Sequence, residues 1–476
     1  MEVFANPSDF GVRTFGMPDN PGYLGVCFGS VITANSPASQ GAQPANWRSV
    51  LWHEFCHVVT LHLTRNKMPR WLSEGISVYE ERQANPAWGE SLNPRYREMI
   101  LGKDLMPVSG LSAAFLSPKT PMHLQFAYYE SSLVVEFLVQ RFGLESLKGI
   151  LRDLGAGVEI NDAIAKHTAP MEQIEKDFAA FARDCAEKLA PGLDWEKPVA
   201  GNSMPEGTAA LAMVRPLLNP MATNAPAEPA TTNTPTVQPR RGAPPPRSPP
   251  TVRVAPTPLL ESGEAALMEW IANHPTNYYA LTEQAKMLLE QKKFQDAKAP
   301  LQKLIELYPA QKGADSAYAM LADVHHELGE TNQERDVLVK LAAVDTDATD
   351  AFLRLMELFA AAKDWPAVVL NAERYLAVNP LVVQPHRYLA RASEELGKAQ
   401  PAIGAYQTVL LFDPPDPADV HFRLARLLRQ AGDPAAKRQV LQALEEAPRF
   451  REAQRLLLDI TGELPRNQTN SPGVSP

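Results

Sequence analysis

Two histidines and a glutamate that could bind and use a metal ion lie in the segment His53-Glu54-Phe55-Cys56-His57. Apolar residues recur at helical spacing from about Asn46 to Thr64, so this segment is predicted to be helical. Residues four apart in a helix lie one turn above each other, so both imidazoles can reach one cation. Glu54 lies beside them and can hold a water molecule on that cation. The segment alone is only moderately specific, because a helix can carry two histidines at this spacing by chance.

A third ligand is available in the segment Pro69-Arg-Trp-Leu-Ser-Glu74-Gly75. Glu74 stands 17 positions after His57, which leaves room for the first helix to end and the chain to turn back. A second helix is predicted at about 72–82, with Glu74 in its first turn, facing the histidines. Two imidazoles and one carboxylate suit Zn²⁺, and three protein ligands leave a fourth position open for water, as in catalytic sites. The alternative is that Glu74 only stabilises a helix N-terminus.

The segments HEFCH (53–57) and WLSEGISVYEE (71–81) together resemble the gluzincin metallopeptidases, the thermolysin-like superfamily. The resemblance covers about residues 22–189. It implies an α+β zincin-like fold, hydrolysis of peptide bonds, zinc bound by His53, His57 and Glu74, and Glu54 as the catalytic base. The interval between His57 and Glu74 is slightly shorter than is usual in that family, and a tighter turn between the two helices would absorb the difference.

The resemblance also implies a tyrosine that stabilises the oxyanion of the reaction. The segment Ala127-Tyr-Tyr-Glu-Ser131 belongs to an apolar helix that ends at Phe142-Gly143. Counting back from Gly143 places the family tyrosine at Tyr128, with Tyr129 as the neighbouring alternative. Another interpretation is that both rings pack in the core. His123 is a weaker candidate for the same role.

Two departures from the family pattern concern the residues before the first helix. Aminopeptidases of this superfamily carry an acidic residue on the strand before the zinc helix, and Gly25–Ser30 has none. An endopeptidase-like activity is therefore expected rather than removal of N-terminal residues. Short strands are expected at 12–15, 23–28 and 31–33, which is a small upper lobe for a zincin. If sequence before Met1 is missing, a lost export signal would make the protein periplasmic or secreted; the residues present show no signal peptide.

Proline dominates the middle of the chain. From Pro216 to Pro258 there are 13 prolines in 43 residues. Proline removes a backbone donor and restricts φ, so this stretch is predicted to be a disordered linker, assigned to residues 199–262.

A repeat follows the linker. Pro309, Pro380, Pro414 and Pro448 are spaced by 71, 34 and 34 residues, and 71 is close to two periods. A second marker, such as Leu396-Gly397, recurs every 34 or 35 residues. This period is that of tetratricopeptide repeats, helix–turn–helix units that stack into a solenoid. Residues 264–464 resemble about five such repeats, which implies a surface that binds a protein partner or substrate.

The predicted organisation is therefore a zincin-like metallopeptidase domain (1–198), a linker (199–262), an all-α repeat solenoid (263–464) and a disordered tail (465–476). The net charge of −9 in 476 residues argues against a nucleic-acid partner. No apolar run reaches the ~18–20 residues of a membrane span. The predicted function is zinc-dependent peptide hydrolysis with a repeat domain that recruits a protein. The rival is a repeat scaffold with an inactive peptidase-like domain.

Overall fold

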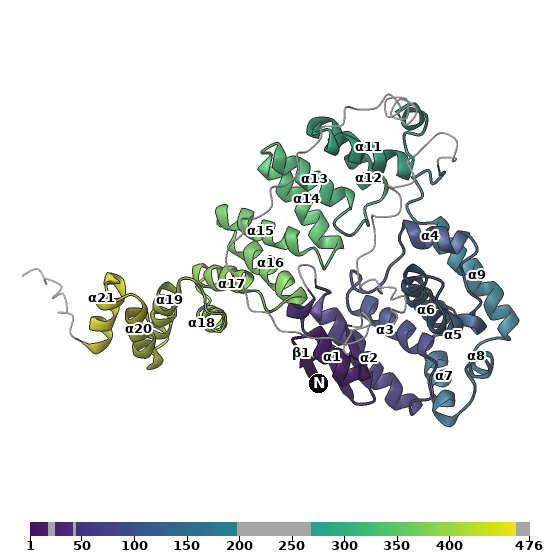
Figure 1. The fold of residues 1–476 in the computed structure, drawn as a ribbon, viewed down its shortest axis with the longest axis horizontal. Coiled ribbons are helices and arrows are strands. Elements are labelled where there is room, and N and C mark those ends of the chain that lie inside the picture. The colour runs from purple at the N-terminus through teal and green to yellow at the C-terminus, as the bar shows by residue number, and fades with distance from the viewer. Residues whose placement is uncertain (18–23, 41–43, 198–267, 463–476) are drawn as a thin grey trace, which may run out of the picture.

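The computed structural model describes residues 1–17, 24–40, 44–197 and 268–462. Over these residues the chain is mostly helical, with one small sheet near the N-terminus (Figure 1). The predicted linker at 199–262 and the predicted tail at 465–476 lie outside the described residues. Among the helices that are described, none combines the length and the apolar character needed to cross a membrane.

The sheet has three short strands, β1 (Glu2–Phe4), β2 (Gly25–Phe28) and β3 (Val31–Asn35). β3 lies in the middle, parallel to β1 and antiparallel to β2, with Gly25 opposite Ala34 in the β2–β3 register. The strands expected at 23–28 and 31–33 are thus found within the described residues. β2 is an edge strand, so one side of its backbone is available for pairing.

The strand predicted at 12–15 is wrong, because these residues belong to helix α1 (Pro7–Phe15). Asn6 caps this helix, with its side-chain oxygen accepting a hydrogen bond of 2.8 Å from the backbone N–H of Ser8. Pro7 occupies the first helical position, where its missing N–H costs nothing. A short 3₁₀ helix, Pro37–Ser39, follows the sheet.

Eight helices complete the described part of the N-terminal half, with a 3₁₀ turn at Val108–Gly110. They are α2 (Trp47–Thr64), α3 (Arg70–Ala84), α4 (Pro94–Leu101), α5 (Leu111–Leu116), α6 (Pro121–Phe142), α7 (Leu144–Ala156), α8 (Ile160–His167) and α9 (Met171–Glu187). The helices predicted around 46–64 and 72–82 are confirmed as α2 and α3, and the apolar helix predicted to end at Phe142-Gly143 is confirmed as α6. The short helices α4, α5 and α8 were not predicted, because segments of six to eight residues show little periodicity.

The turn between α2 and α3 is tight, as the short interval between His57 and Glu74 requires. It contains two non-glycine residues in the left-handed region, Arg65 (φ 52°) and Asn66 (φ 60°). The backbone N–H of Asn66 donates to the carbonyl of Leu61, which ends α2. α3 begins earlier than expected, at Arg70, so Glu74 lies in its second turn and not in its first.

α3 crosses α6 at very close range. Gly75, next to Glu74, lies against the backbone of Ser131: a Cβ on Gly75 would stand 2.6 Å from the Ser131 carbonyl oxygen. Trp71 and Leu72 of α3 and Val134 of α6 are fully buried in the same core. The absence of a side chain at position 75 therefore sets the depth at which α3 holds Glu74.

We expect Gly75→Ala to lower the free energy of unfolding by about 1–3 kcal/mol, because the new methyl group meets rigid backbone. Thermal unfolding would show this as a fall of roughly 2–4 °C per kcal/mol for a domain of this size. Gly404→Ala is the matched control, since a Cβ there meets nothing within 4 Å. If both variants melt like the wild-type protein, the crossing has more room than the structure shows.

The C-terminal half is a row of helix pairs. The helices are α11 (Tyr278–Glu290), α12 (Phe294–Leu307), α13 (Ala317–Glu327), α14 (Thr331–Val344), α15 (Thr349–Ala361), α16 (Trp365–Val378), α17 (Val383–Glu395), α18 (Ala399–Leu410), α19 (Pro417–Gln430), α20 (Ala435–Glu446) and α21 (Arg451–Thr461). α11 to α20 form five successive antiparallel pairs, and α21 packs on the last of them. Figure 1 shows α19 to α21 projecting away from the N-terminal half, whereas α16 lies beside it.

Both repeating sequence markers have a structural cause. Gly329, Lys363, Gly397 and Gly432 each follow the first helix of a pair and have φ between 59° and 70°. This left-handed residue ends the helix and starts the turn, and it favours glycine. The prolines of the first marker follow the second helix of a pair. No proline follows α14, where Asp345 ends the helix instead, and this explains the doubled spacing of 71 residues.

The two halves contact each other directly. Asn46, which caps α2, donates a hydrogen bond of 3.1 Å from Nδ2 to the carbonyl of Thr346. Lys312 Nζ donates to the carbonyl of Ala87 at 3.1 Å. α16 also packs against α2. The helix that carries the histidines is therefore held from the side of the repeats as well as from its own half.

Candidate metal centre

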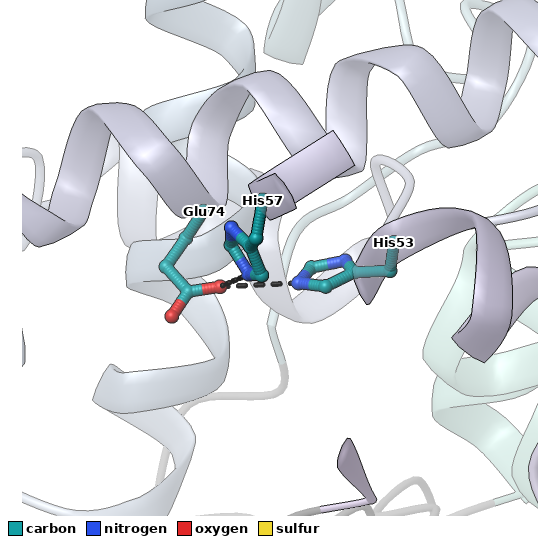
Figure 2. A group of neighbouring side chains, drawn as sticks. All are labelled: His53, His57 and Glu74. Atoms are coloured by element: carbon teal, nitrogen blue, oxygen red, sulfur yellow. Dashed lines mark hydrogen bonds and ion pairs between the residues drawn. The ribbon is translucent and has the colours of Figure 1, made fainter. Parts of the chain in front are cut away.

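α2 and α3 bring His53, His57 and Glu74 to one point (Figure 2). Glu74 Oε2 lies 3.1 Å from His53 Nε2 and 3.3 Å from His57 Nε2. The two imidazole rings stand nearly perpendicular, with centroids 4.8 Å apart. His57 and Glu74 are buried, and His53 is half-buried. The structure thus gathers the three side chains that the sequence predicted as ligands.

The donor atoms fit a small divalent cation. Ligand atoms at ~2.0–2.1 Å from tetrahedral zinc lie about 3.3 Å from each other, and both distances from Glu74 Oε2 are close to that value. All three atoms face the same small space and lie within 4.8 Å of one another. These residues can therefore hold a metal ion.

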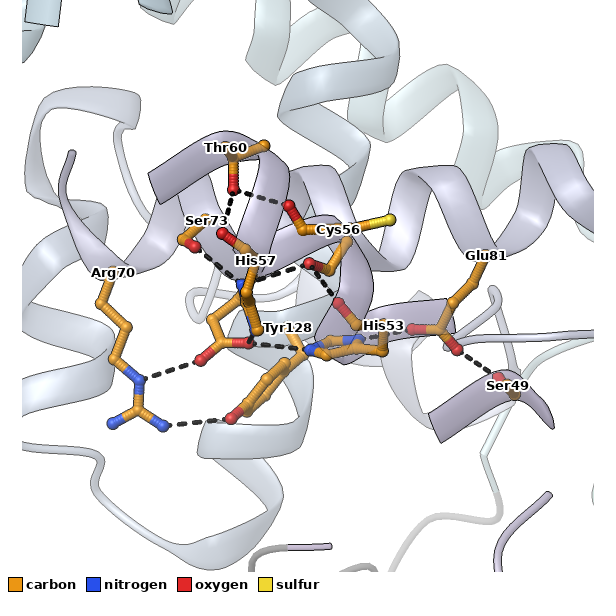
Figure 3. A network of polar contacts seen from close by, with 11 residues as sticks. Ser49, His53, Cys56, His57, Thr60, Arg70, Ser73, Glu81 and Tyr128 are labelled. Atoms are coloured by element: carbon orange, nitrogen blue, oxygen red, sulfur yellow. Dashed lines mark hydrogen bonds and ion pairs between the residues drawn. The ribbon is translucent and has the colours of Figure 1, made fainter. Parts of the chain in front are cut away.

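Each histidine is held at its other ring nitrogen (Figure 3). His53 Nδ1 lies 2.6 Å from Glu81 Oε1, and Ser49 Oγ donates to Glu81 Oε2 at 2.5 Å. His57 Nδ1 lies 2.8 Å from Ser73 Oγ. A protonated Nδ1 that donates to Glu81 leaves the Nε2 lone pair of His53 available to a cation. Such partners orient the ligands of protein metal sites.

Glu81, Ser73 and Arg70 were not identified from the sequence. Arg70 Nε donates to Glu74 Oε1 at 3.2 Å, so it holds the carboxylate whose other oxygen faces the histidines. A signal was present: along α3, polar residues recur at positions 70, 73, 74 and 77 on one helical face, the residues between them up to Tyr79 are apolar or glycine, and Glu81 continues that face. The polar face predicts buried polar partners, although it does not say which histidine each would meet.

The surroundings of the cluster favour a positively charged His53 next to a negatively charged Glu74. Burial opposes the charged form of His53, but hydrogen bonds to Glu74 and Glu81 outweigh it and raise its pKa well above the ordinary value. Burial would likewise raise the pKa of Glu74, but hydrogen bonds from both histidines lower it well below the ordinary value. The site stabilises a carboxylate next to a positive charge, a role that a cation can fill.

Glu54 is buried next to these residues with an uncommitted oxygen. Its Oε2 is inaccessible and has no hydrogen-bond partner among the described residues. Burial, the largest effect, raises the pKa of Glu54 above its ordinary value. Gly25 of β2 leaves the space that this side chain occupies, because a Cβ there would lie 2.7 Å from Glu54 Oε1. A carboxyl group with these properties suits a proton acceptor.

The two candidate tyrosines have different surroundings. Tyr128 accepts a hydrogen bond of 3.1 Å from Arg70, the residue that also holds Glu74 (Figure 3). Tyr129 is buried, and its ring stacks on Tyr96 at a centroid distance of 5.1 Å. His123 is held by Thr120 and Asp104. The structure therefore brings Tyr128 towards the candidate metal ligands and places Tyr129 in the core.

A cavity of about 1630 Å³ opens beside the cluster. Its lining includes the three candidate ligands with Glu54 and Tyr128, and also Gly25–Cys27 of β2. Its opposite side is formed by repeat residues of α13 to α15 and the loops that precede α13 and α15. The volume exceeds the roughly 300–1,000 Å³ of a small-molecule pocket and leaves room for a segment of polypeptide.

A second group of possible metal donors joins Asp194, Glu196 and His274, outside the cavity. Both carboxylate oxygens of Asp194 are already hydrogen-bonded, one to the backbone N–H of Glu196 and the other to Asn277 Nδ2. The backbones of Asp194 and Asn277 also form a parallel bridge. This group has a structural explanation as a link between the two halves of the chain.

Comparisons with known proteins agree with this division. Residues 26–183 match the model of the Peptidase MA superfamily, and residues 279–310 match a tetratricopeptide repeat. The first match contains the whole metal centre, and the second covers α11 and α12. The chain therefore contains a Peptidase MA superfamily domain and a tetratricopeptide repeat domain. The comparison with curated proteins found no match.

Solved structures similar to this chain include two proteins described as tetratricopeptide repeat proteins. YrrB, described as a TPR protein with an unusual peptide-binding site, is 16% identical; the match covers 42% of this chain and 98% of YrrB, with a TM-score of 0.31. A MamA protein is 17% identical, with coverage of 39% and 94% and a TM-score of 0.28. A tetratricopeptide repeat protein from Parabacteroides merdae is 19% identical, with coverage of 43% and 80% and a TM-score of 0.26.

Proposed function

We propose that this protein is a zinc-dependent peptidase of the gluzincin type. The observation that carries the proposal is the convergence of His53, His57 and Glu74 next to the buried, uncommitted Oε2 of Glu54. The match of residues 26–183 to the Peptidase MA superfamily supports it. The surrounding cavity is large enough for a peptide substrate.

Zn²⁺ held by these three residues would polarise the scissile carbonyl and lower the pKa of a water molecule from ~15.7 toward ~7. Glu54 would accept the proton of the attacking water on its carboxylate and deliver it to the nitrogen of the leaving amine. Its raised pKa favours acceptance of the proton, because burial stabilises the neutral form of the carboxyl group. Glu81 and Ser73 would keep the imidazoles of His53 and His57 in orientation.

Tyr128 would donate its hydroxyl hydrogen to the developing oxyanion. The guanidinium of Arg70, 3.1 Å away, makes the phenol a stronger donor. We expect Tyr128→Phe to lower kcat by roughly 10²–10³-fold, the cost of losing one oxyanion donor, with little change in KM or zinc content. Tyr129→Phe is the matched control and should keep most of the activity, because that ring packs in the core. The reverse result would exchange the roles of the two tyrosines.

The substrate is expected to be cleaved at internal bonds. Gly25–Cys27 of edge strand β2 lines the cavity and can pair with the backbone of an extended peptide. β2 carries no acidic side chain that would bind the free amine of a substrate N-terminus. The repeats would contribute to binding the protein substrate or a partner.

The experiment is cleavage of an unstructured protein by the full-length chain, with a chelator and after addition of zinc. We expect turnover that the chelator abolishes and zinc restores. The rival function, a repeat scaffold with an inert peptidase-like half, predicts bound zinc without turnover. Hydrolysis of esters but not of peptides would instead point to another kind of zinc hydrolase.

A further inference from the structure

The wall of the cavity opposite the metal centre is built by the repeats. α13 contributes Ala319, Ala322 and Asp323, and α15 contributes Asp350 and Ala351. These residues come from the first helices of two successive pairs. The alanines are small, which leaves room for a polypeptide backbone to run along the wall. Any substrate that reaches Glu54 through this cavity also lies next to the repeats.

Three aspartates on this wall lack partners. Asp315, Asp323 and Asp350 are exposed and have no hydrogen bond or ion pair with any described residue. The surrounding protein atoms have the largest effect on the pKa of Asp323 and raise it. His326 lowers this pKa, and neighbouring carboxylates that include Asp350 raise it. The repeat wall therefore carries negative charge that the protein does not neutralise itself.

Four basic side chains around the cavity already form ion pairs, and Lys312 on the repeat wall donates to the carbonyl of Ala87. The pairs are Arg70 with Glu74, Arg95 with Glu98, Lys119 with Asp104, and Arg354 with Glu334. The same cavity contains the buried, unpartnered Oε2 of Glu54. The cavity thus offers a reactive centre on one side and unpaired carboxylates on the other.

We propose that this cavity binds an extended polypeptide segment rich in lysine or arginine, with the cationic side chains of the segment paired to Asp323 and Asp350. The proposal rests on the proposed peptidase function and specifies its substrate class. It assigns the first repeats a direct part in selecting the bond to be cleaved. A cavity of about 1630 Å³ has room for a segment of polypeptide, so the segment is expected to be unstructured or a loop.

The binding test uses the full-length Glu54→Gln protein, which would hold substrate without turning it over. A labelled Gly/Ser-rich peptide with several lysines is compared, by fluorescence anisotropy, with the peptide in which glutamine replaces each lysine. We expect the lysine peptide to bind at least about tenfold more tightly at low salt and to lose this advantage at high salt. Equal affinities for the two peptides would overturn the proposal.

Substitution of single aspartates tests which carboxylates bind the lysine side chains of the peptide. Asp323→Asn and Asp350→Asn should each weaken binding of the lysine peptide about threefold, and together about tenfold, as expected for partly exposed ion pairs. Affinity for the glutamine peptide should not change. Asp336→Asn is the matched control, an exposed aspartate of α14 outside the cavity. A loss of affinity as large in Asp336→Asn would show only a general effect of net charge and would overturn the assignment.

Cleavage assays with wild-type protein separate this proposal from the one on which it rests. Selective binding of the lysine peptide without any zinc-dependent turnover would defeat the peptidase function and leave the binding site standing. Zinc-dependent turnover of both peptides at equal kcat/KM, unchanged in the double variant, would establish the peptidase and overturn the preference for basic segments.

Discussion

Glu54→Gln is expected to lower kcat for peptide cleavage by about 10²–10⁴-fold, the contribution typical of a positioned general base. The amide keeps the shape of the side chain but cannot accept the proton of water. Zinc content should not change, because Glu54 is not one of the three converging ligands. The measurements are steady-state kinetics and metal analysis on the same preparation. Glu80→Gln, a half-exposed residue of α3 outside the cavity, is the matched control.

Glu54→Gln should be at least as stable as the wild-type protein. Burial raises the pKa of Glu54, so the folded state holds the proton more tightly than the unfolded state does. A group with a raised pKa contributes its stability at pH below the unfolded value and loses it as pH rises through the folded value. Without metal, the stability of the wild-type protein relative to Glu54→Gln should therefore fall as pH rises above about 4.5. A variant that melts earlier at neutral pH would show that Glu54 is structural.

Glu74→Gln is expected to abolish stable zinc binding, and activity with it. The isosteric amide keeps the side-chain volume but removes the carboxylate that faces both imidazoles. The loss of affinity should exceed the roughly 10–100-fold typical of outer-sphere partners, because Glu74 is itself a proposed ligand. Metal analysis after gel filtration should find zinc in the wild-type protein and little in the variant.

Thermal unfolding gives an independent measurement of the same loss. Zinc at ~1,000 times its dissociation constant stabilises by about 4 kcal/mol, so a chelator should lower the Tm of the wild-type protein by roughly 10 °C. The Tm of Glu74→Gln should not respond to chelator. Asp194→Asn, in the second group of possible donors, should respond like the wild type. A chelator shift that survives in Glu74→Gln would place the metal elsewhere.

The helices that carry the candidate metal ligands could be predicted from the sequence because residue spacing and apolar periodicity are local properties. The spacing of His53 and His57 and the apolar periodicity from 46 to 64 predicted α2, and the structure has this helix at Trp47–Thr64. The short interval to Glu74 predicted a tight turn, which Arg65 and Asn66 form. The error at α1 arose where a cap and a proline outweighed a short apolar alternation, a common limit of pattern reading.

The sequence did not predict the residues that hold the candidate ligands from positions distant in the chain. Glu81 lies 28 positions from His53, and nothing near either residue says that the two side chains meet at 2.6 Å. Ser73 and Arg70 were missed for the same reason. Apolar spacing also does not separate the faces of α2, because Phe55 lies within the apolar periodicity at 46–64 and is nevertheless 56% exposed. Which apolar face of α2 is buried depends on the elements that pack against the helix in the folded protein.

The sequence alone determined the chemistry available to this protein: two imidazoles and a carboxylate for a cation, a second carboxylate beside them, and a 34-residue helical period, because each depends on residue type and short spacing. The tertiary structure decided everything that depends on long-range packing. It set the depth of Glu74 through the contact of Gly75 with Ser131, chose Tyr128 over Tyr129 as the residue near the cluster, and turned the first repeats toward the metal-binding residues. Residues more than 200 positions apart share one cavity only because the folded chain brings them together.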